Sequence, residues 1–192
     1  MAKAFKYGSR GITGSLHSAE RKLLRDLFAD IIHMLEERAE LHRLPEGLDP
    51  LYALTGMRPA DLELPPIGDP ALARLLPDAS DDPQVAREHR RLTESGLIGE
   101  KIGRLREAQF LLETDKIVLD PAGARRFAQA LNDVRLVLSE RLEIRSEADS
   151  ERISQINDAK DVTTPEEYLG LVYNLVSWVQ DTLMHALMNA EY

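Results

Sequence analysis

The sequence contains no cysteine among its 192 residues. This absence excludes disulfide bonds, thiolate-ligated metals, a cysteine nucleophile and any thiol-based switch. The N-terminal residues 1–11 lack the apolar core of a secretion signal, and no apolar run approaches the length of a membrane span. Together these absences predict a cytoplasmic protein.

Recognisable catalytic motifs are also missing. The sequence has no P-loop, dinucleotide-binding fingerprint, nucleophile elbow or zincin motif. The best metal-like arrangement is Asp30, His33 and Glu37, which share one face of a predicted helix. It occurs once and lies largely off the apolar stripe, whereas di-iron bundles need inward-pointing Glu-x-x-His pairs on two helices. We therefore expect no enzymatic activity, no metal and no cofactor.

Basic residues are fewer than acidic ones: the sequence has 24 Lys and Arg and 33 Asp and Glu, which gives a net charge of −9. This balance argues against broad, nonspecific nucleic-acid binding, which depends on neutralising phosphates. A local basic patch stays open. The best candidate lies on a long predicted helix over residues 83–113, and its members are Arg87, Arg90, Arg91, Lys101 and Arg104. Such a patch either is solvated and paired with carboxylates on its own helix, or contacts an acidic partner, RNA or DNA.

Length and a 43% share of hydrophobic residues fit a single helical domain over residues 1–192. A wide apolar stripe predicts a helix over residues 18–43. Asp-Pro steps at 49–50, 69–70 and 82–83 combine an N-cap with a first-turn proline, and predict two short helices and then the long one. Thr164 and Glu167 form a capping box that opens the last helix.

The ends of the predicted helices leave three other segments. Residues 1–16 form a basic arm with Lys3, Lys6 and Arg10, or a small hairpin built from residues 5–7 and 12–16. Residues 116–119 are apolar and extended, and could pair with that hairpin. Residues 145–163 are polar and mostly acidic, which predicts a mobile surface loop or a loosely held turn of helix.

A central helix is predicted within residues 120–144, with Asp120 as its N-cap and Pro121 in its first turn. Its core stripe recurs at steps of three and four, whereas Leu136 and Val137 fall outside the stripe. A helix that is apolar on most sides is usually covered on most sides. The stripe is formed by Phe127, Leu131, Val134, Leu138 and Leu142.

The same helix carries the most distinctive polar group in the chain, Asn132-Asp133-x-Arg135. A partly buried guanidinium needs a carboxylate or several carbonyls, and the positions three and four away from Arg135 carry no charge. We expect Arg135 to find a carboxylate or carbonyls on a neighbouring element, and so to fix how the first and last helices pack on this one. The alternative is that Asn132, Asp133 and Arg135 form a ligand or partner site.

The last helix has two apolar sides. One is a core stripe that runs from Leu169 to Leu187, and the other consists of Leu171, Leu175 and Trp178. Such a helix either sits deep in a bundle or presents one side to a partner. The simplest partner is a second copy of the chain in a two-fold dimer.

Four segments carry a resemblance to a known family: residues 69–79 (DPALARLLPDA), 91–94 (RLTE), 131–138 (LNDVRLVL) and 178–180 (WVQ). Over most of its length the chain is similar to an actinobacterial family of mostly helical proteins of unknown function, which includes the AosR-like transcriptional regulators. The resemblance implies redox-responsive gene regulation through contacts with a sigma factor, and genes that often neighbour the adaptor of the Clp protease. A thiol-based response does not carry over, because the chain has no cysteine.

These observations predict a mainly α single domain of five to seven helices with a small N-terminal β-hairpin. The predicted function is a non-enzymatic regulatory or protein-interaction module, whose partner belongs to the transcription machinery and which forms a homodimer. Direct DNA binding is the first alternative, and requires the basic arm and the long helix on one face of a dimer. A metal- or ligand-binding enzyme is the second.

Overall fold

The computed structural model describes residues 3–43, 63–156, 160 and 162–191. Within these residues there are six helices and one three-stranded sheet, which confirms the predicted mainly α fold with a small N-terminal hairpin. The short helix predicted after Asp49-Pro50 lies outside the described residues. No helix in the described part of the chain is long and apolar enough to cross a membrane.

The sheet is antiparallel and joins the N-terminus to the middle of the chain. Its strands, in spatial order, are β1 (Lys3–Gly8), β2 (Gly11–Ser15) and β3 (Lys116–Leu119). Ile12 lies opposite Leu119, so the predicted pairing of residues 116–119 with the hairpin is confirmed. Gly11 has φ +91°, and a Cβ there would lie 2.7 Å from the carbonyl oxygen of Leu119. Only glycine meets both conditions without strain.

The helices begin largely where local signals place them. The side chains of Asp69, Asp82 and Asp120 each accept a first-turn backbone N–H, directly before a proline. Thr164 and Glu167 exchange the two hydrogen bonds of the predicted capping box. The helices are α1 (Ser18–Glu40), α3 (Pro70–Leu75), α4 (Pro83–Leu111), α5 (Pro121–Arg141), α6 (Glu147–Ser154) and α7 (Pro165–Glu191).

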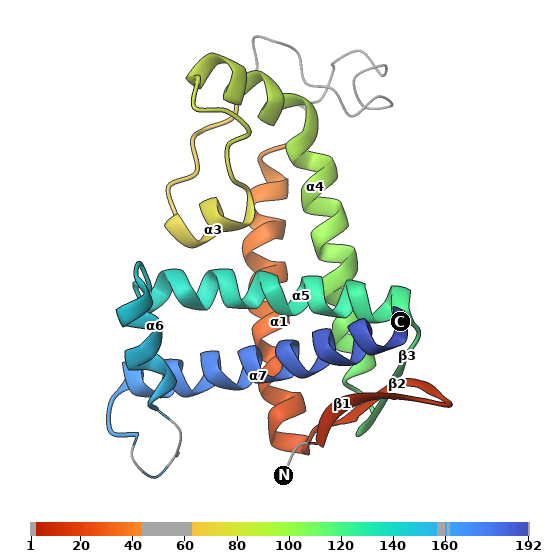
Figure 1. Ribbon diagram of the computed structural model, residues 1–192. Coiled ribbons are helices and arrows are strands. Elements are labelled where there is room, and N and C mark those ends of the chain that lie inside the picture. The colour runs from red at the N-terminus through yellow and green to blue at the C-terminus, as the bar shows by residue number, and fades with distance from the viewer. Residues whose placement is uncertain (1–2, 44–62, 157–159, 161, 192) are drawn as a thin grey trace.

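Two pairs of helices cross one another. α1 packs beside α4, and α5 packs beside α7 across them, while the sheet lies against α7 through β1 (Figure 1). α3 packs against the C-terminal half of α5, where Arg141 pairs with Asp69 and Glu140 with Arg74 (Figure 1). The crossing places α5 in contact with α1, α3, α4 and α7.

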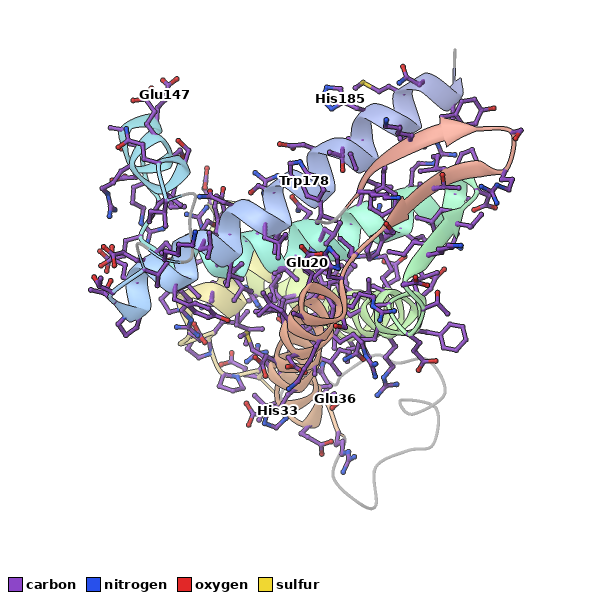
Figure 2. All side chains as sticks on the ribbon, turned by 90° about the horizontal axis from the view of Figure 1, so that it is seen from below. Glu20, His33, Glu36, Glu147, Trp178 and His185 are labelled. Carbon is purple, nitrogen blue, oxygen red and sulfur yellow. The ribbon has the colours of Figure 1, made fainter. Side chains whose placement is uncertain are left out.

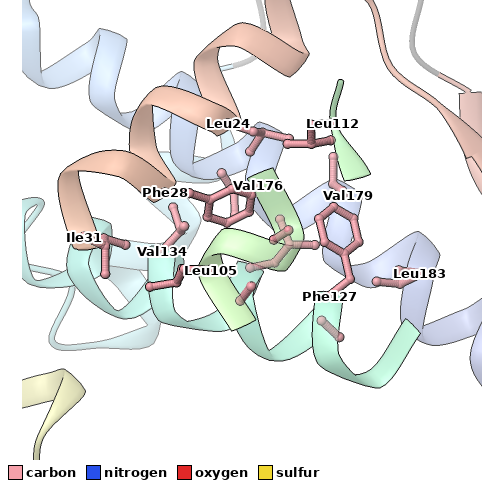
Figure 3. Packing of buried hydrophobic residues seen from close by; sticks show 14 of the residues in the cluster. Leu24, Phe28, Ile31, Leu105, Leu112, Phe127, Val134, Val176, Val179 and Leu183 are labelled. Carbon is pink, nitrogen blue, oxygen red and sulfur yellow. The ribbon is translucent and has the colours of Figure 1, made fainter. Parts of the chain in front are cut away.

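The core fills the crossing. Figure 3 shows Leu24 and Phe28 of α1, Leu105 of α4, Phe127 of α5 and Val176 of α7 gathered in one cluster. The Phe127 ring centroid lies 6.4 Å from that of Phe28 and 6.2 Å from that of Phe5 on β1. Aromatic pairs at this spacing stabilise a core beyond their buried area. All five residues of the predicted α5 stripe are buried, and Leu136 and Val137 are half-buried against the same cluster.

Helix α4 is continuous across Gly96, Gly99 and Gly103. Figure 1 shows that it bends in its N-terminal half. There the hydroxyl of Thr93 donates a hydrogen bond to the carbonyl of His89, 2.9 Å away. A side chain that bonds the preceding turn in this way bends helices.

The segment predicted as an acidic loop, residues 145–163, contains α6. Ser146 and Asp149 form a capping box that starts the helix, and Ile153 is fully buried against α7 at Gly170. The local cap and one buried isoleucine outweigh the acidic composition. Residues 157–159 and 161 of this segment lie outside the described residues.

Candidate functional site

The charged side chains of the Asn132-Asp133-x-Arg135 group on α5 contact two different helices, α4 and α7. Asp133 is buried, and its Oδ1 accepts a hydrogen bond from Nζ of Lys101 on α4 at 2.6 Å. One turn further along α4, Nη2 of Arg104 lies 3.8 Å from Oδ2 of Asp133. The buried ion pair of this group therefore belongs to Asp133, while Asn132 beside it is exposed.

Arg135 turns towards α7. Its Nη1 donates a hydrogen bond to Oε1 of Gln180 at 2.8 Å, and its guanidinium lies 5.7 Å from the centroid of the Tyr173 ring. Nε2 of Gln180 donates in turn to the carbonyl of Ala128 on α5. The expected carbonyl partner on a neighbouring element is thus a side-chain amide of the last helix. The polar contacts of Arg135 with described residues do not include the first helix, to which we also expected it to connect.

Two groups predicted separately meet in one depression. Asn132 and Asp133 on α5 lie next to Lys101 and Arg104, which the sequence assigned to a basic patch on α4. The depression lies between α4, α5 and α7 and has a volume of about 450 Å³. The other polar lining residues, Arg125, Gln129 and Gln180, were not identified from the sequence. Arg125 and Gln129 could have been found from spacing, because they lie on the same face of α5 as Asn132, at steps of four and three. The remaining lining residues are Ala128 and Met184.

The rest of the predicted basic patch is partly neutralised. Arg90 donates hydrogen bonds to Asp78 and to Glu94, each at 2.5 Å. Arg91 pairs with Glu88 at 2.6 Å. Arg87 is exposed and forms no ion pair with a described residue. The patch is therefore a set of separate side chains, of which Arg90, Arg91 and Lys101 are held by carboxylates.

A second buried polar cluster, which we call the Glu94 cluster, ties α1 to α4. Oε1 of Glu94 accepts from Nε of Arg38 at 2.6 Å and from Nε2 of His42 at 2.9 Å, and Oε2 accepts from Arg90. Arg38 also donates to the carbonyl of Pro65. Burial alone would raise the pKa of Glu94, but the hydrogen bonds from His42, Arg38 and Arg90 lower it to about 2. In the sequence, Glu94 stands out only as part of a family segment.

The outward face of the sheet is basic. Opposite residues of antiparallel strands share a face, so the pairings place Lys6, Thr13 and Val118 in one row and Lys3, Ser15 and Lys116 in the next. A hollow of about 490 Å³ on this face is also lined by Arg10, and none of the described residues that line it is an Asp or Glu. The sequence indicated Lys3, Lys6 and Arg10. It missed Lys116, which only the β2–β3 pairing brings there. We call the cations Lys3, Lys6, Arg10 and Lys116 the sheet-face cations.

The second apolar side of α7 is largely covered. Leu171 and Leu175 are half-buried, and Trp178 is 38% exposed. Figure 2 shows Trp178 near the middle of α7. A dimer contact through these three residues stays a prediction.

The metal-like residues on α1 are spread over its solvent side. His33 and Glu37 are highly exposed, with Nε2 and Oε1 3.4 Å apart, and Asp30 is exposed as well. Figure 2 shows His33 on the outside of α1. In the described part of the chain no three His, Asp or Glu residues are placed to hold a metal ion.

Fold and polar clusters define a mainly α scaffold in which buried ion pairs join crossing helices and a small sheet closes one end. The chain belongs to the family described as Domain of unknown function (DUF2017), which matches residues 2–187. No curated protein matches the chain, and no solved structure matches it. The four segments that carry the resemblance supply Asp78, Glu94, Asp133, Arg135 and Gln180, all of which take part in the contacts above.

Proposed function

We propose that the protein is a non-enzymatic, cytoplasmic regulatory module that acts by binding an acidic surface of a protein partner through the outward face of its sheet. The observation that supports this is the set of four sheet-face cations without a lining carboxylate, on a chain of net charge −9. Complementary charge steers association and selects partners. Val118, 55% exposed between the cations, adds an apolar contact.

The resemblance to AosR-like regulators supports a partner in the transcription machinery. The basic patch on α4 fits this role less well than the sheet face, because Arg90 and Arg91 already bind carboxylates. Reversing their charge would disturb the fold as well as any complex. The sheet-face lysines make no ion pair with described residues, so they can be changed without that complication.

A photoreactive amino acid at Val118 tests the proposal in cells of the source organism. We expect it to capture a defined protein, and expect the double variant K6E/K116E to lose the capture while its unfolding midpoint is unchanged. The matched control is K22E/R87E, which carries the same change of charge on exposed residues of α1 and α4. Equal capture by both double variants would contradict the proposal.

Direct DNA binding is the second candidate, because the same four cations could contact phosphates. Fluorescence anisotropy with labelled duplex DNA at low salt separates the two. Binding that K6E/K116E loses and K22E/R87E keeps would favour DNA. Absence of binding at low salt would count against it, because phosphate contacts are strongest there.

A homodimer through Leu171, Leu175 and Trp178 is part of the proposal and has its own test. Sedimentation velocity should give a dimer for the wild type and a monomer for Trp178→Ala, with unchanged helicity by circular dichroism. A wild-type monomer at micromolar concentration would dispose of the dimer without affecting the sheet-face contact.

A further inference from the structure

The depression between α4, α5 and α7 contains a guanidinium whose hydrogen-bonding groups are unused. No described residue accepts a hydrogen bond from Arg104, and its Nε is buried without a partner. Its side chain is only 17% exposed, and the nearest carboxylate oxygen, Oδ2 of Asp133, is beyond hydrogen-bond distance at 3.8 Å. A guanidinium has five N–H donors, and removing such donors from water is costly unless another group accepts from them.

The charges around Arg104 favour an anion. Lys101, Arg104 and Arg125 line the depression, and the only carboxylate among its lining residues is Asp133. Asp133 is itself buried, with Oδ1 held by Lys101 and Oδ2 closed off from solvent. It therefore holds Lys101 in place, and with three cations and one carboxylate among its lining residues the depression keeps an excess of positive charge.

Neutral donors and fixed walls complete the site. The side-chain amides of Asn132 and Gln129 line the same depression. Gln180, which forms part of the α7 side, is held by its hydrogen bonds to Arg135 and to the carbonyl of Ala128. A site whose lining is already held in place loses less entropy when a ligand binds.

We propose that this depression binds one oxyanion group, a phosphate or a carboxylate, which accepts hydrogen bonds from Arg104 and from the amide of Asn132 close to the charge of Lys101. The planar fork of an arginine matches the geometry of both groups. The oxyanion can belong to a small free anion or to an acidic or phosphorylated side chain of a partner protein, since the chemistry that recognises it is the same. This subsite is separate from the sheet face and does not depend on the function proposed for it.

Isothermal titration calorimetry with inorganic phosphate and with citrate, at constant ionic strength, tests the subsite. We expect saturable one-to-one binding to the wild type. The affinity should fall by about tenfold or more in Arg104→Gln, the scale of one lost charge-assisted hydrogen bond. Arg87→Gln is the matched control, because it removes the same charge from an exposed position on α4, and it should bind like the wild type.

A second variant controls for the possibility that substitution of Arg104 affects folding. Asn132 is exposed, so Asn132→Ala should leave the unfolding midpoint unchanged and still weaken binding. Wild-type protein that binds neither probe saturably, or affinities that are the same in wild type, R104Q and N132A, would overturn the proposal. Titration with a phosphoserine peptide shows whether the bound oxyanion comes from a partner protein or from a small free anion. Tighter binding than free phosphate points to a partner side chain, and equal or weaker binding points to a small anion.

Discussion

Glu94 is the residue on which most buried charge converges. Arg38, His42 and Arg90 all donate to its two carboxylate oxygens, and its side chain is only 3% exposed. A buried carboxylate is tolerated when its charge is paired and its oxygens are hydrogen-bonded. The cluster therefore fixes the C-terminal end of α1 against α4.

Replacing this carboxylate with an amide should be strongly destabilising. We expect Glu94→Gln to lower the free energy of unfolding at pH 7 by about 3–5 kcal/mol, because it leaves buried cations without their counter-charge. Urea denaturation measures the loss. Glu88→Gln, on the exposed side of the same helix, should cost less than about 1 kcal/mol. Similar losses in the two variants would show that the Glu94 cluster contributes nothing beyond a surface pair.

We also expect part of the stability that Glu94 provides to be lost in acid. The pKa of Glu94 is lowered from 4.5 to about 2 in the folded chain, so the ionised form stabilises the fold. This contribution, up to about 3 kcal/mol, is complete above the unfolded-state pKa and is lost as pH falls from near 4.5 towards 2. The difference in unfolding free energy between wild type and Glu94→Gln should therefore narrow across that window. A difference independent of pH would contradict the lowered pKa.

The sequence could predict that a charged residue is partly buried and needs a partner, but not which residue that partner is. Partial burial of Arg135 followed from the apolar residues around it, and so did its need for a carboxylate or carbonyls on another element; the structure supplies the side-chain carbonyl of Gln180. The Lys101–Asp133 pair did not follow, because 32 positions separate the two residues and no spacing rule connects them. The same reason hid the depression, since its residues come from three helices that only tertiary packing brings together.

Elements with local start signals were predictable. The Asp-Pro steps at 69–70, 82–83 and 120–121 and the capping box of Thr164 and Glu167 start helices where expected, because capping acts within one turn. The pairing of residues 116–119 with the hairpin was predicted as a possibility, because the segment is short, apolar and extended, and the structure confirms it. Residues 145–163 were predicted only as a mobile loop or a loosely held turn of helix, because their polar, acidic composition masked the capping box of Ser146 and Asp149 that starts α6.

Asn174 of α7 makes two hydrogen bonds to the C-terminal end of α6. Its Nδ2 donates to the carbonyls of Ile153 and Ile156 at 2.7 and 2.9 Å, and so satisfies carbonyl groups at the C-terminal end of α6. We expect Asn174→Ala to free α6 locally, at a cost of about 1–3 kcal/mol for the lost bonds to buried carbonyls. Hydrogen exchange should accelerate in residues 147–156 and stay slow in α5.

The exposed Asn189 on the same helix provides the control for this prediction. Asn189→Ala should leave exchange in α6 unchanged. If Asn174→Ala also leaves it unchanged, burial of Ile153 alone holds α6, and the two hydrogen bonds are incidental.

Across the whole molecule, the first and last elements are packed together. β1 lies along α7, and Phe5 of β1 reaches the core cluster that contains Phe127 and Val176. The sheet is thus part of the main core and not an appendage to it. Unfolding of the hairpin should uncover α7.

Removing the Phe5 ring tests whether the sheet and α7 unfold together. We expect Phe5→Ala to lower the free energy of unfolding by about 3–5 kcal/mol, the usual cost of deleting a buried phenylalanine. Hydrogen exchange should accelerate in α7 as well as in the strands, with a single unfolding transition. Tyr7→Ala, on the same strand but 52% exposed, should have little effect. Faster exchange confined to residues 3–15 would instead show that the sheet opens as an independent unit.

The pairing of β2 with β3 has a consequence for synthesis of the chain. Residues 11–15 hydrogen-bond with residues 116–119, and α7, which covers β1, begins only at Pro165. Chains grow at about 5–20 residues per second, and contacts between distant residues form late. A growing chain shorter than 116 residues therefore holds a hairpin without its third strand, and Phe5 and Ile12 lack most of the cover they have in the finished fold. During translation, this N-terminal segment therefore stays open to chaperones and to aggregation until β3 and α7 have been made.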